Sequence, residues 1–155
     1  MPTTEQASAD QIDELIALES LLFAEDAAQH DTFVDTTWPV REGHQDFEQL
    51  LADPACVVLV DRDHRQLIGF LAGYWTPSSS TRLPVRYAVL RSLFVRVEHR
   101  RSGSGSRMTE QFIRWAKAND CVEAHVDSYI ANDTAQHFYE RHGFFGRSLS
   151  RSRTL

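Results

Sequence analysis

The chain has 155 residues, of which 42% are hydrophobic and 25% charged, with 7 Gly and 5 Pro. These values disfavour disordered, collagen-like and coiled-coil chains, and they predict a single domain over residues 1–155. No apolar run approaches the roughly 20 residues of a membrane helix, and residues 1–10 lack a signal-peptide core, so we expect a cytoplasmic protein with no membrane partner. Cys56 and Cys121 border apolar runs, which favours buried thiols over a disulfide framework or a metal site.

Charge is distributed unevenly along the chain. The formal net charge is −6, which disfavours a nucleic-acid partner. Residues 1–63 hold 15 Asp and Glu against 2 Arg, whereas residues 64–155 hold 14 Lys and Arg against 7 Asp and Glu. Two interpretations remain open: a randomly decorated surface, or a protein that meets a cationic ligand through its first half and an anionic ligand through its second.

The first half of the chain begins with helical periodicity. Apolar residues recur at helical spacing over residues 10–29, and Ser8 and Gln11 fit a capping box at the start of this helix. Residues 30–40 contain Trp-Pro and are expected to form a loop, and residues 42–52 are expected to form a short second helix.

The middle of the chain has the pattern of strands. Residues 56–60 and 67–75 predict a hairpin, and residues 86–97 are the longest strand candidate. Strict alternation along this last strand places one set of side chains on each face. Val89, Arg91, Leu93 and Val95 form one set, and Ala88, Leu90, Ser92 and Phe94 form the other.

The second half alternates helices and strands. A turn at residues 100–106 precedes a helix that ends near Asn119, and residues 122–129 predict a strand. A last helix, capped by Asn132 or Asp133, ends at Gly143 and is followed by an extended segment over residues 144–155. This order predicts an α/β fold with a mixed sheet and helices on both faces.

The turn between the long strand and its following helix has the chemistry of an anion site. Gly103 and Gly105 allow a ligand to approach the backbone, and a helix start offers free N–H groups and the positive end of the helix dipole. These features suit a pyrophosphate. An ordinary glycine turn with surface arginines would contain the same residues, so the turn alone does not decide between the two interpretations.

Two segments of the chain resemble the GNAT superfamily of N-acyltransferases. Arg100-x-x-Gly103-x-Gly105 resembles the acyl-CoA signature of that family, and residues 132–144 resemble its Asn–Ala–Tyr–Gly–Phe segment. Both stand in the family's order, and the resemblance covers about residues 12–149. It implies a mostly antiparallel sheet that is splayed in the middle. It also implies an enzyme that transfers the acetyl group of acetyl-CoA to a primary amine by direct attack.

The resemblance also implies roles for individual residues. The backbone of Leu93, Phe94 and Val95 would pair with the pantetheine arm, and an N–H near Val95 would polarise the thioester carbonyl. Asn132 would bind the pantetheine arm, and the Tyr139 hydroxyl would protonate the departing thiolate. The pyrophosphate would lie against the segment formed by Arg100, Arg101, Ser102, Gly103, Ser104, Gly105 and Ser106.

The sequence departs from the family at the catalytic base. An ammonium must lose a proton before its nitrogen can attack, yet Val89 and Arg91 stand where family members often carry Glu. Asp127 is the first candidate for a base or an amine anchor. A water-relayed path is equally open. The second candidates are Glu25, Asp26, His30 and Asp31.

The acceptor is expected to be a small-molecule or peptide amine. Asp26 and Asp31 would attract a cation, whereas Arg91 would instead bind the carboxylate of an amino-acid acceptor. A non-catalytic acyl-CoA-binding regulatory module of the same fold is the alternative, and the net charge argues against an aminoacyl-tRNA acceptor.

The sequence has no metal-ligand spacing and no nucleophile motif, so we expect no metal and no covalent intermediate. The strand period of residues 148–155 predicts an edge strand and a homodimer.

Overall fold

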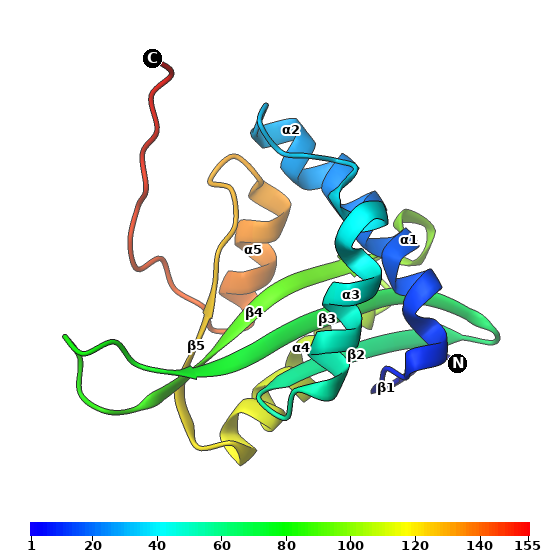
Figure 1. Ribbon diagram of the computed structural model, residues 1–155, viewed down its shortest axis with the longest axis horizontal. Coiled ribbons are helices and arrows are strands. Elements are labelled where there is room, and N and C mark those ends of the chain that lie inside the picture. Colours follow the sequence, from blue (N-terminus) through cyan, green and yellow to red (C-terminus); the bar gives the residue numbers. More distant parts are fainter.

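The computed structural model describes all residues of the chain, 1–155. Five strands form one sheet in the order β1-β2-β3-β4-β5, and Figure 1 shows the helices packed on its two faces. Neighbouring strands are antiparallel except β4 and β5, which are parallel. The predicted mixed, mostly antiparallel sheet is therefore confirmed. The strands are β1 (Thr3–Gln6), β2 (Cys56–Asp63), β3 (Gln66–Pro77), β4 (Arg86–Val95) and β5 (Cys121–Val126).

Helices connect and cover the sheet. The first helix is α1 (Ile12–Leu22), which starts from the short helix η1 (Ala9–Gln11) and continues through the π-helical turn η2 (Phe23–Ala27) into α2 (Ala28–His30). The remaining helical elements are α3 (Trp38–Ala52), η3 (Val97–His99), α4 (Ser104–Ala118) and α5 (Asp133–Arg141). No helix combines the length and the hydropathy that a membrane span requires.

Each face of the sheet has its own hydrophobic core. On one face, Leu15 and Leu18 of α1 and Phe47 of α3 pack on Val60 and Phe70. On the other face, Met108 and Phe112 of α4 pack on Leu59, Leu71 and Leu90. Complete burial of such a side chain contributes roughly 1.5–3 kcal/mol, so the two cores together fix the helices against the sheet.

A bulge in β4 changes the face on which its side chains lie. Ala72 pairs with Ser92, but Gly73 pairs with Leu90, so β4 carries one extra residue at Arg91. An extra residue reverses the alternation beyond it. Leu90 therefore shares the α4 face with Leu93, whereas Phe94 faces α1. The expected strict alternation along this strand was wrong.

Gly73, at this bulge, has a packing reason to be glycine. A Cβ built there would lie 2.6 Å from the Phe112 ring of α4 and 2.8 Å from the Val89 carbonyl oxygen. The close approach of the helix to the sheet therefore depends on the missing side chain.

The pairing of β4 with β5 is short. It runs from Arg86 opposite Cys121 to Leu90 opposite Val126 and then stops. The edge of β4 from Arg91 to Val95 consequently has no partner strand, although β3 pairs its other edge as far as Val95. The expected splaying of the sheet is present at this point.

Several boundaries differ from the sequence-based expectations. Helix α3 begins at Trp38 and not at residue 42, because Pro39 lies in its first turn, where proline is well tolerated. Strand β5 ends at Val126, so the predicted continuation to residue 129 is a loop. No strand follows α5: residues 144–155 form an exposed tail that leaves the body of the molecule (Figure 1). The expected closing strand was wrong for the single chain, since no strand pairs with this segment.

Candidate active site

The free edge of β4 presents the backbone of Val95. The Arg96 N–H donates to the Ile68 carbonyl of β3 over 2.7 Å. Because backbone groups of an antiparallel strand alternate between its two edges, the N–H and C=O of Val95 point to the opposite side, away from β3. Strand β4 therefore ends with backbone groups facing the gap beside β5.

The glycine turn follows β4 at once and starts α4. Gly103 has a φ of +87° and is the N-cap of this helix, a conformation that side chains with a Cβ rarely adopt. Gly105 lies in the first turn, where a Cβ would make ordinary contact with Phe138 of α5 at 3.4 Å. The amides of Ser104, Gly105 and Ser106 have no intrahelical acceptor four residues back, so this turn presents free donors.

A buried carboxylate that the sequence analysis missed anchors this helix start. Asp61 of β2 has no exposed surface. It accepts hydrogen bonds from the Thr4 hydroxyl at 2.8 Å, the Ser104 hydroxyl at 2.5 Å and the Arg107 guanidinium at 2.7 Å. The charge of Arg107 is thus satisfied inside the protein, and Asp61 holds the N-terminal turn of α4 against the sheet.

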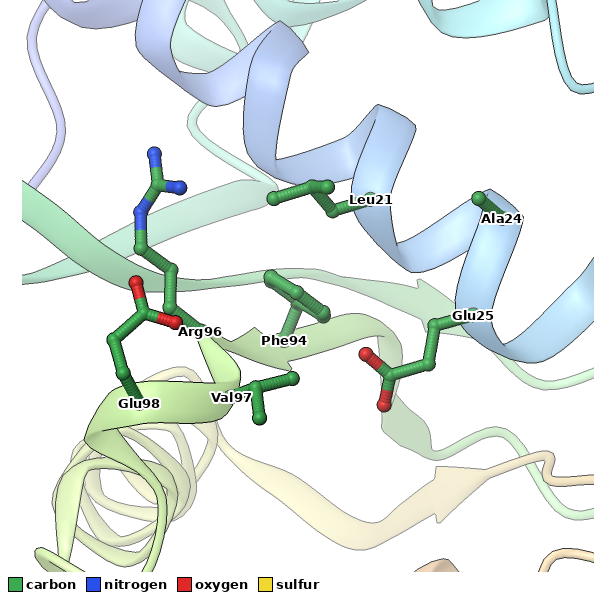
Figure 2. Close-up of a pocket in the computed structure, with 7 residues that line it drawn as sticks. All are labelled: Leu21, Ala24, Glu25, Phe94, Arg96, Val97 and Glu98. Carbon is green, nitrogen blue, oxygen red and sulfur yellow. The ribbon is translucent and has the colours of Figure 1, made fainter.

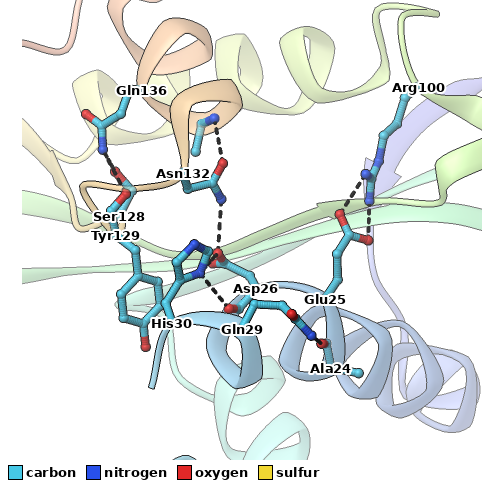
Figure 3. Close-up of polar contacts among 11 residues, drawn as sticks. Ala24, Glu25, Asp26, Gln29, His30, Arg100, Ser128, Tyr129, Asn132 and Gln136 are labelled. Atoms are coloured by element: carbon cyan, nitrogen blue, oxygen red, sulfur yellow. Dashed lines mark hydrogen bonds and ion pairs between the residues drawn. The ribbon is translucent and has the colours of Figure 1, made fainter. Parts of the chain in front are cut away.

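Arg100 joins the glycine turn to η2. Its guanidinium forms an ion pair with Glu25, with a shortest N–O distance of 2.6 Å, and its Nε donates to the Val95 carbonyl over 2.8 Å. Figure 3 shows this pair bridging the two elements. Arg101 and Ser102 next to it are exposed.

A pocket of about 440 Å³ lies beside the Arg100–Glu25 pair. The side chains of Leu21, Glu25, Phe94 and Val97 border it in Figure 2. Its walls are the end of α1 with η2 on one side and the end of β4 with η3 on the other. The remaining lining residues are Ala24, Arg96 and Glu98.

The π-helical turn η2 directs acidic side chains at two other elements. A π turn inserts one extra residue into a helix and is frequent at functional sites. Glu25 forms the ion pair with Arg100. Asp26 accepts a hydrogen bond from the Asn132 amide over 3.0 Å. Asn132 is also the N-cap of α5, because its side-chain oxygen accepts from the Ala135 N–H at 3.1 Å. The contacts shown in Figure 3 therefore join the first helix to the last one.

Tyr139 lies on the inner side of α5. Its ring packs edge-on against Phe138 and Phe144, with centroids 5.3 Å and 5.7 Å apart. Burial, and after it the negative charge of Asp26, raises the pKa of Tyr139 to about 12. The hydroxyl therefore keeps its proton at neutral pH.

The acidic candidates occupy different surroundings. Asp127 is exposed in the loop after β5. Asp31 accepts a hydrogen bond from the Phe33 N–H at 2.9 Å. Burial raises the pKa of Tyr129, with smaller contributions from the charges of Asp31 and Asp26. Asp26, Asp31 and Tyr129 therefore lie in one region, and Asp127 lacks a comparable set of contacts.

Arg91 is held by two carboxylates. The bulge points it at α1 and α3, where its nearest contacts are Asp46 at 2.8 Å and Glu19 at 3.6 Å. Glu19 is 2% exposed, and burial raises its pKa to about 7, against the opposing effect of Arg91. The sequence analysis missed Glu19 as well. A carboxylate inside the apolar stripe of a helix was its only signal.

In this fold the parallel strands β4 and β5 separate next to the point where β4 continues through the glycine turn into α4. This is the architecture of an acyl-CoA-dependent N-acetyltransferase. The family model for GNAT acetyltransferases matches residues 18–144, and the chain belongs to this family. The resemblance stated from the two motifs is thereby confirmed.

Solved structures of other proteins have the same fold. A tetramutant of the BH1408 protein of Bacillus halodurans matches with a TM-score of 0.88 and 18% identity, covering 99% of each chain. The aminoglycoside 6'-N-acetyltransferase AAC(6')-Ih of Acinetobacter baumannii matches at 0.75 and 22%, covering 100% of this chain and 99% of the other. The aminoglycoside N-acetyltransferase AAC(6')-Iy in complex with CoA matches at 0.80 and 16%, covering 99% and 95%. At such identities these similarities show the fold alone. Among curated protein sequences, none matches the chain significantly.

Proposed function

We propose that this protein transfers the acetyl group of acetyl-CoA to a primary amine of a cationic small molecule. The observation that carries the proposal is the continuity of the free β4 edge, the glycine turn and the start of α4. An extended pantetheine arm can add to an unpaired strand edge, and a pyrophosphate can bind at a helix start with free amides. The residues present therefore fit this cosubstrate.

The chain offers one group for the negative charge that develops on the carbonyl oxygen and another for the charge that develops on the leaving sulfur. Acetyl-CoA would supply its acetyl group activated as a thioester. The outward N–H of Val95 would stabilise negative charge on the carbonyl oxygen. Tyr139 would donate the proton that the leaving sulfur needs. Arg100, Asn132 and the amides of the glycine turn would hold the remainder of the cosubstrate.

The acceptor side is acidic. Asp26 and Asp31 lie along and after η2, and Arg91, the predicted contact for a substrate carboxylate, is already bound by Asp46 and Glu19. This arrangement supports a cationic acceptor over an amino acid. Two of the structurally similar proteins are named aminoglycoside acetyltransferases, which is consistent with an amine of this kind.

The experiment that tests the cosubstrate site is calorimetric titration with acetyl-CoA. We expect Gly103→Val to weaken binding at least tenfold, because its Cβ would strain the turn at a φ of +87° and occupy the approach to the backbone. Gly146→Val is the matched control, since a Cβ there meets nothing within 4 Å. Equal affinities for wild type and Gly103→Val would refute the assignment.

A further inference from the structure

His30 and Asp26 form a histidine–carboxylate pair at the end of the first helix. His30 Nδ1 lies 2.8 Å from the backbone carbonyl oxygen of Asp26 and 3.3 Å from its Oδ1. Both neighbours are acceptors, so Nδ1 carries the hydrogen. In a neutral imidazole the other nitrogen, Nε2, is then unprotonated and able to accept a proton.

The surroundings hold this imidazole in one orientation. Its ring stacks on Tyr129 of the loop after β5, with centroids 4.9 Å apart and an interplanar angle of 17°. Asp26 is fixed from the other side by the Asn132 amide at 3.0 Å. The His30 side chain is 22% exposed, so a solute can reach it even though its ring is held in place.

The pair is also connected to the proposed proton donor. Asn132 caps α5, the helix that carries Tyr139, and the charge of Asp26 acts on the Tyr139 hydroxyl. The ionisable groups that face His30 are Asp26 of its own helix, Asp31 beside it and the Tyr129 phenol on which it stacks.

We infer that His30 is the general base for the acceptor amine and that Asp26 is the residue that positions it. The inference rests on the proposed acetyl transfer. The ammonium first loses one proton to water, and the neutral amine nitrogen then forms its bond to the acetyl carbon and gives a second proton to His30 Nε2. The carbon–sulfur bond breaks, and the sulfur takes the proton of Tyr139. The imidazolium returns one proton, directly or through water, to the tyrosine oxygen, so atoms and charges balance.

The carboxylates of the chain that could act as the general base fit this role less well than His30. Glu19 is 2% exposed and ion-paired with Arg91, and Asp61 is completely buried and accepts three hydrogen bonds. Asp127 is exposed, and no hydrogen bond or ion pair orients it. Beside these carboxylates, His30 combines a fixed tautomer, a carboxylate partner and a side chain that is 22% exposed.

The test compares His30→Gln with His44→Gln as a matched control. His44 of α3 forms a similar pair with Glu48, at 3.0 Å and four residues apart, but its side chain is 63% exposed outside the site. We expect His30→Gln to lower kcat/KM for the amine by roughly 10²–10⁴-fold at neutral pH and to remove the acidic limb of its pH profile. His44→Gln should retain wild-type kinetics.

Two further measurements make the result decisive. Acetyl-CoA affinity, measured by calorimetry, should be unchanged in His30→Gln and in His30→Ala, which shows that the variants fold. Asp26→Asn should move the acidic limb to lower pH, because the imidazolium loses a compensating negative charge. An active wild type with the same kcat/KM and acidic limb in His30→Gln would overturn the base assignment alone. A wild type that neither binds acetyl-CoA nor releases thiol would instead overturn the proposed function.

Discussion

Tyr139 is the proposed proton donor to the leaving thiolate. Burial raises its pKa to about 12, so the hydroxyl is protonated at neutral pH but is a weaker acid than an exposed phenol. Asp26, whose charge acts on this hydroxyl, accepts a hydrogen bond from Asn132. The position of Tyr139 on α5 was predicted from the Asn–Ala–Tyr–Gly–Phe segment, and its catalytic role stays a prediction.

Tyr139→Phe removes only the hydroxyl, so the packing against Phe138 and Phe144 should survive. We expect kcat to fall by roughly 10²-fold or more while acetyl-CoA affinity is unchanged. Stopped-flow measurement of thiol release, with calorimetry as the control, checks this. Wild-type turnover in the variant would mean that the sulfur receives its proton elsewhere.

At the level of single residues, the sequence indicated the glycine turn and the residues of α5 because each local pattern is contiguous. It did not indicate Asp61, Glu19 or the Arg100–Glu25 pair. Their partners come from distant elements, and no local spacing reports a contact between β2 and α4 or between η2 and the glycine turn. The His30–Asp26 pair has helical spacing, but only the packing of Tyr129 distinguishes it from a surface pair such as His44–Glu48.

At the level of elements, periodicity predicted α1 and α4 because each buries one face. Strand β3 was predicted from its run of apolar residues, and it is buried on both faces. The start of α3 was missed because Trp-Pro is typical of loops, although proline also suits a first helical turn. The bulge in β4 was missed because it arises from pairing with β3 and from the Phe112 ring against Gly73. That bulge also decides where Arg91 points, so the predicted substrate contact of Arg91 depended on information that the sequence lacks.

Helix α1 carries a pH-dependent stability term through Glu19. Its pKa is about 7 in the folded protein against an ordinary 4.5. Between about pH 4.5 and pH 7, Glu19 has released its proton in the unfolded chain but retains it in the folded protein. The free energy of unfolding therefore decreases as pH rises through this range, and the contribution of Glu19 is constant above about pH 7. The shift corresponds to at most about 3 kcal/mol.

Glu19→Gln should remove this loss, because the amide does not titrate. We expect the difference in unfolding free energy between about pH 5 and pH 8 to be smaller in Glu19→Gln than in wild type, as measured by urea denaturation. Glu48→Gln, at a side chain that is 59% exposed, is the control and should behave as wild type. An unchanged pH dependence in Glu19→Gln would contradict the account of this residue.

At the level of the whole molecule, neither the outer edge of β5 nor the tail pairs with a further strand. Strand β5 is an edge strand, and the tail exposes Phe145 at 86% and Leu149 at 52%. We expect two copies to associate through this region. Light scattering at micromolar concentration should give twice the 17.7 kDa of the chain, and a chain ending at Arg147 should be monomeric. A full-length monomer would refute the dimer.

The charge asymmetry of the molecule predicts how the acceptor binds. The acidic residues along and after η2 should attract a polycation, and the attraction should weaken as the Debye length falls from ~10 Å at 0.1 M to ~3 Å at 1 M salt. The KM for a polyamine or aminoglycoside should rise with salt, and Asp31→Asn should raise it at low salt. Asp10→Asn, near the N-terminus, is the control. A panel in which amino acids are acetylated and polycations are not would favour Arg91 as the substrate contact.

Acetyl transfer from acetyl-CoA to an amine can be followed with isotope-labelled acetyl-CoA. The protein is incubated with labelled acetyl-CoA and a panel of cationic amines, and the released thiol and any labelled amide are quantified by mass spectrometry. We expect one labelled amide for each thiol released, with both formed roughly 10²-fold or more slowly in Tyr139→Phe. Tight binding of acetyl-CoA without any labelled amide would contradict acetyl transfer and would favour the regulatory module of the same fold.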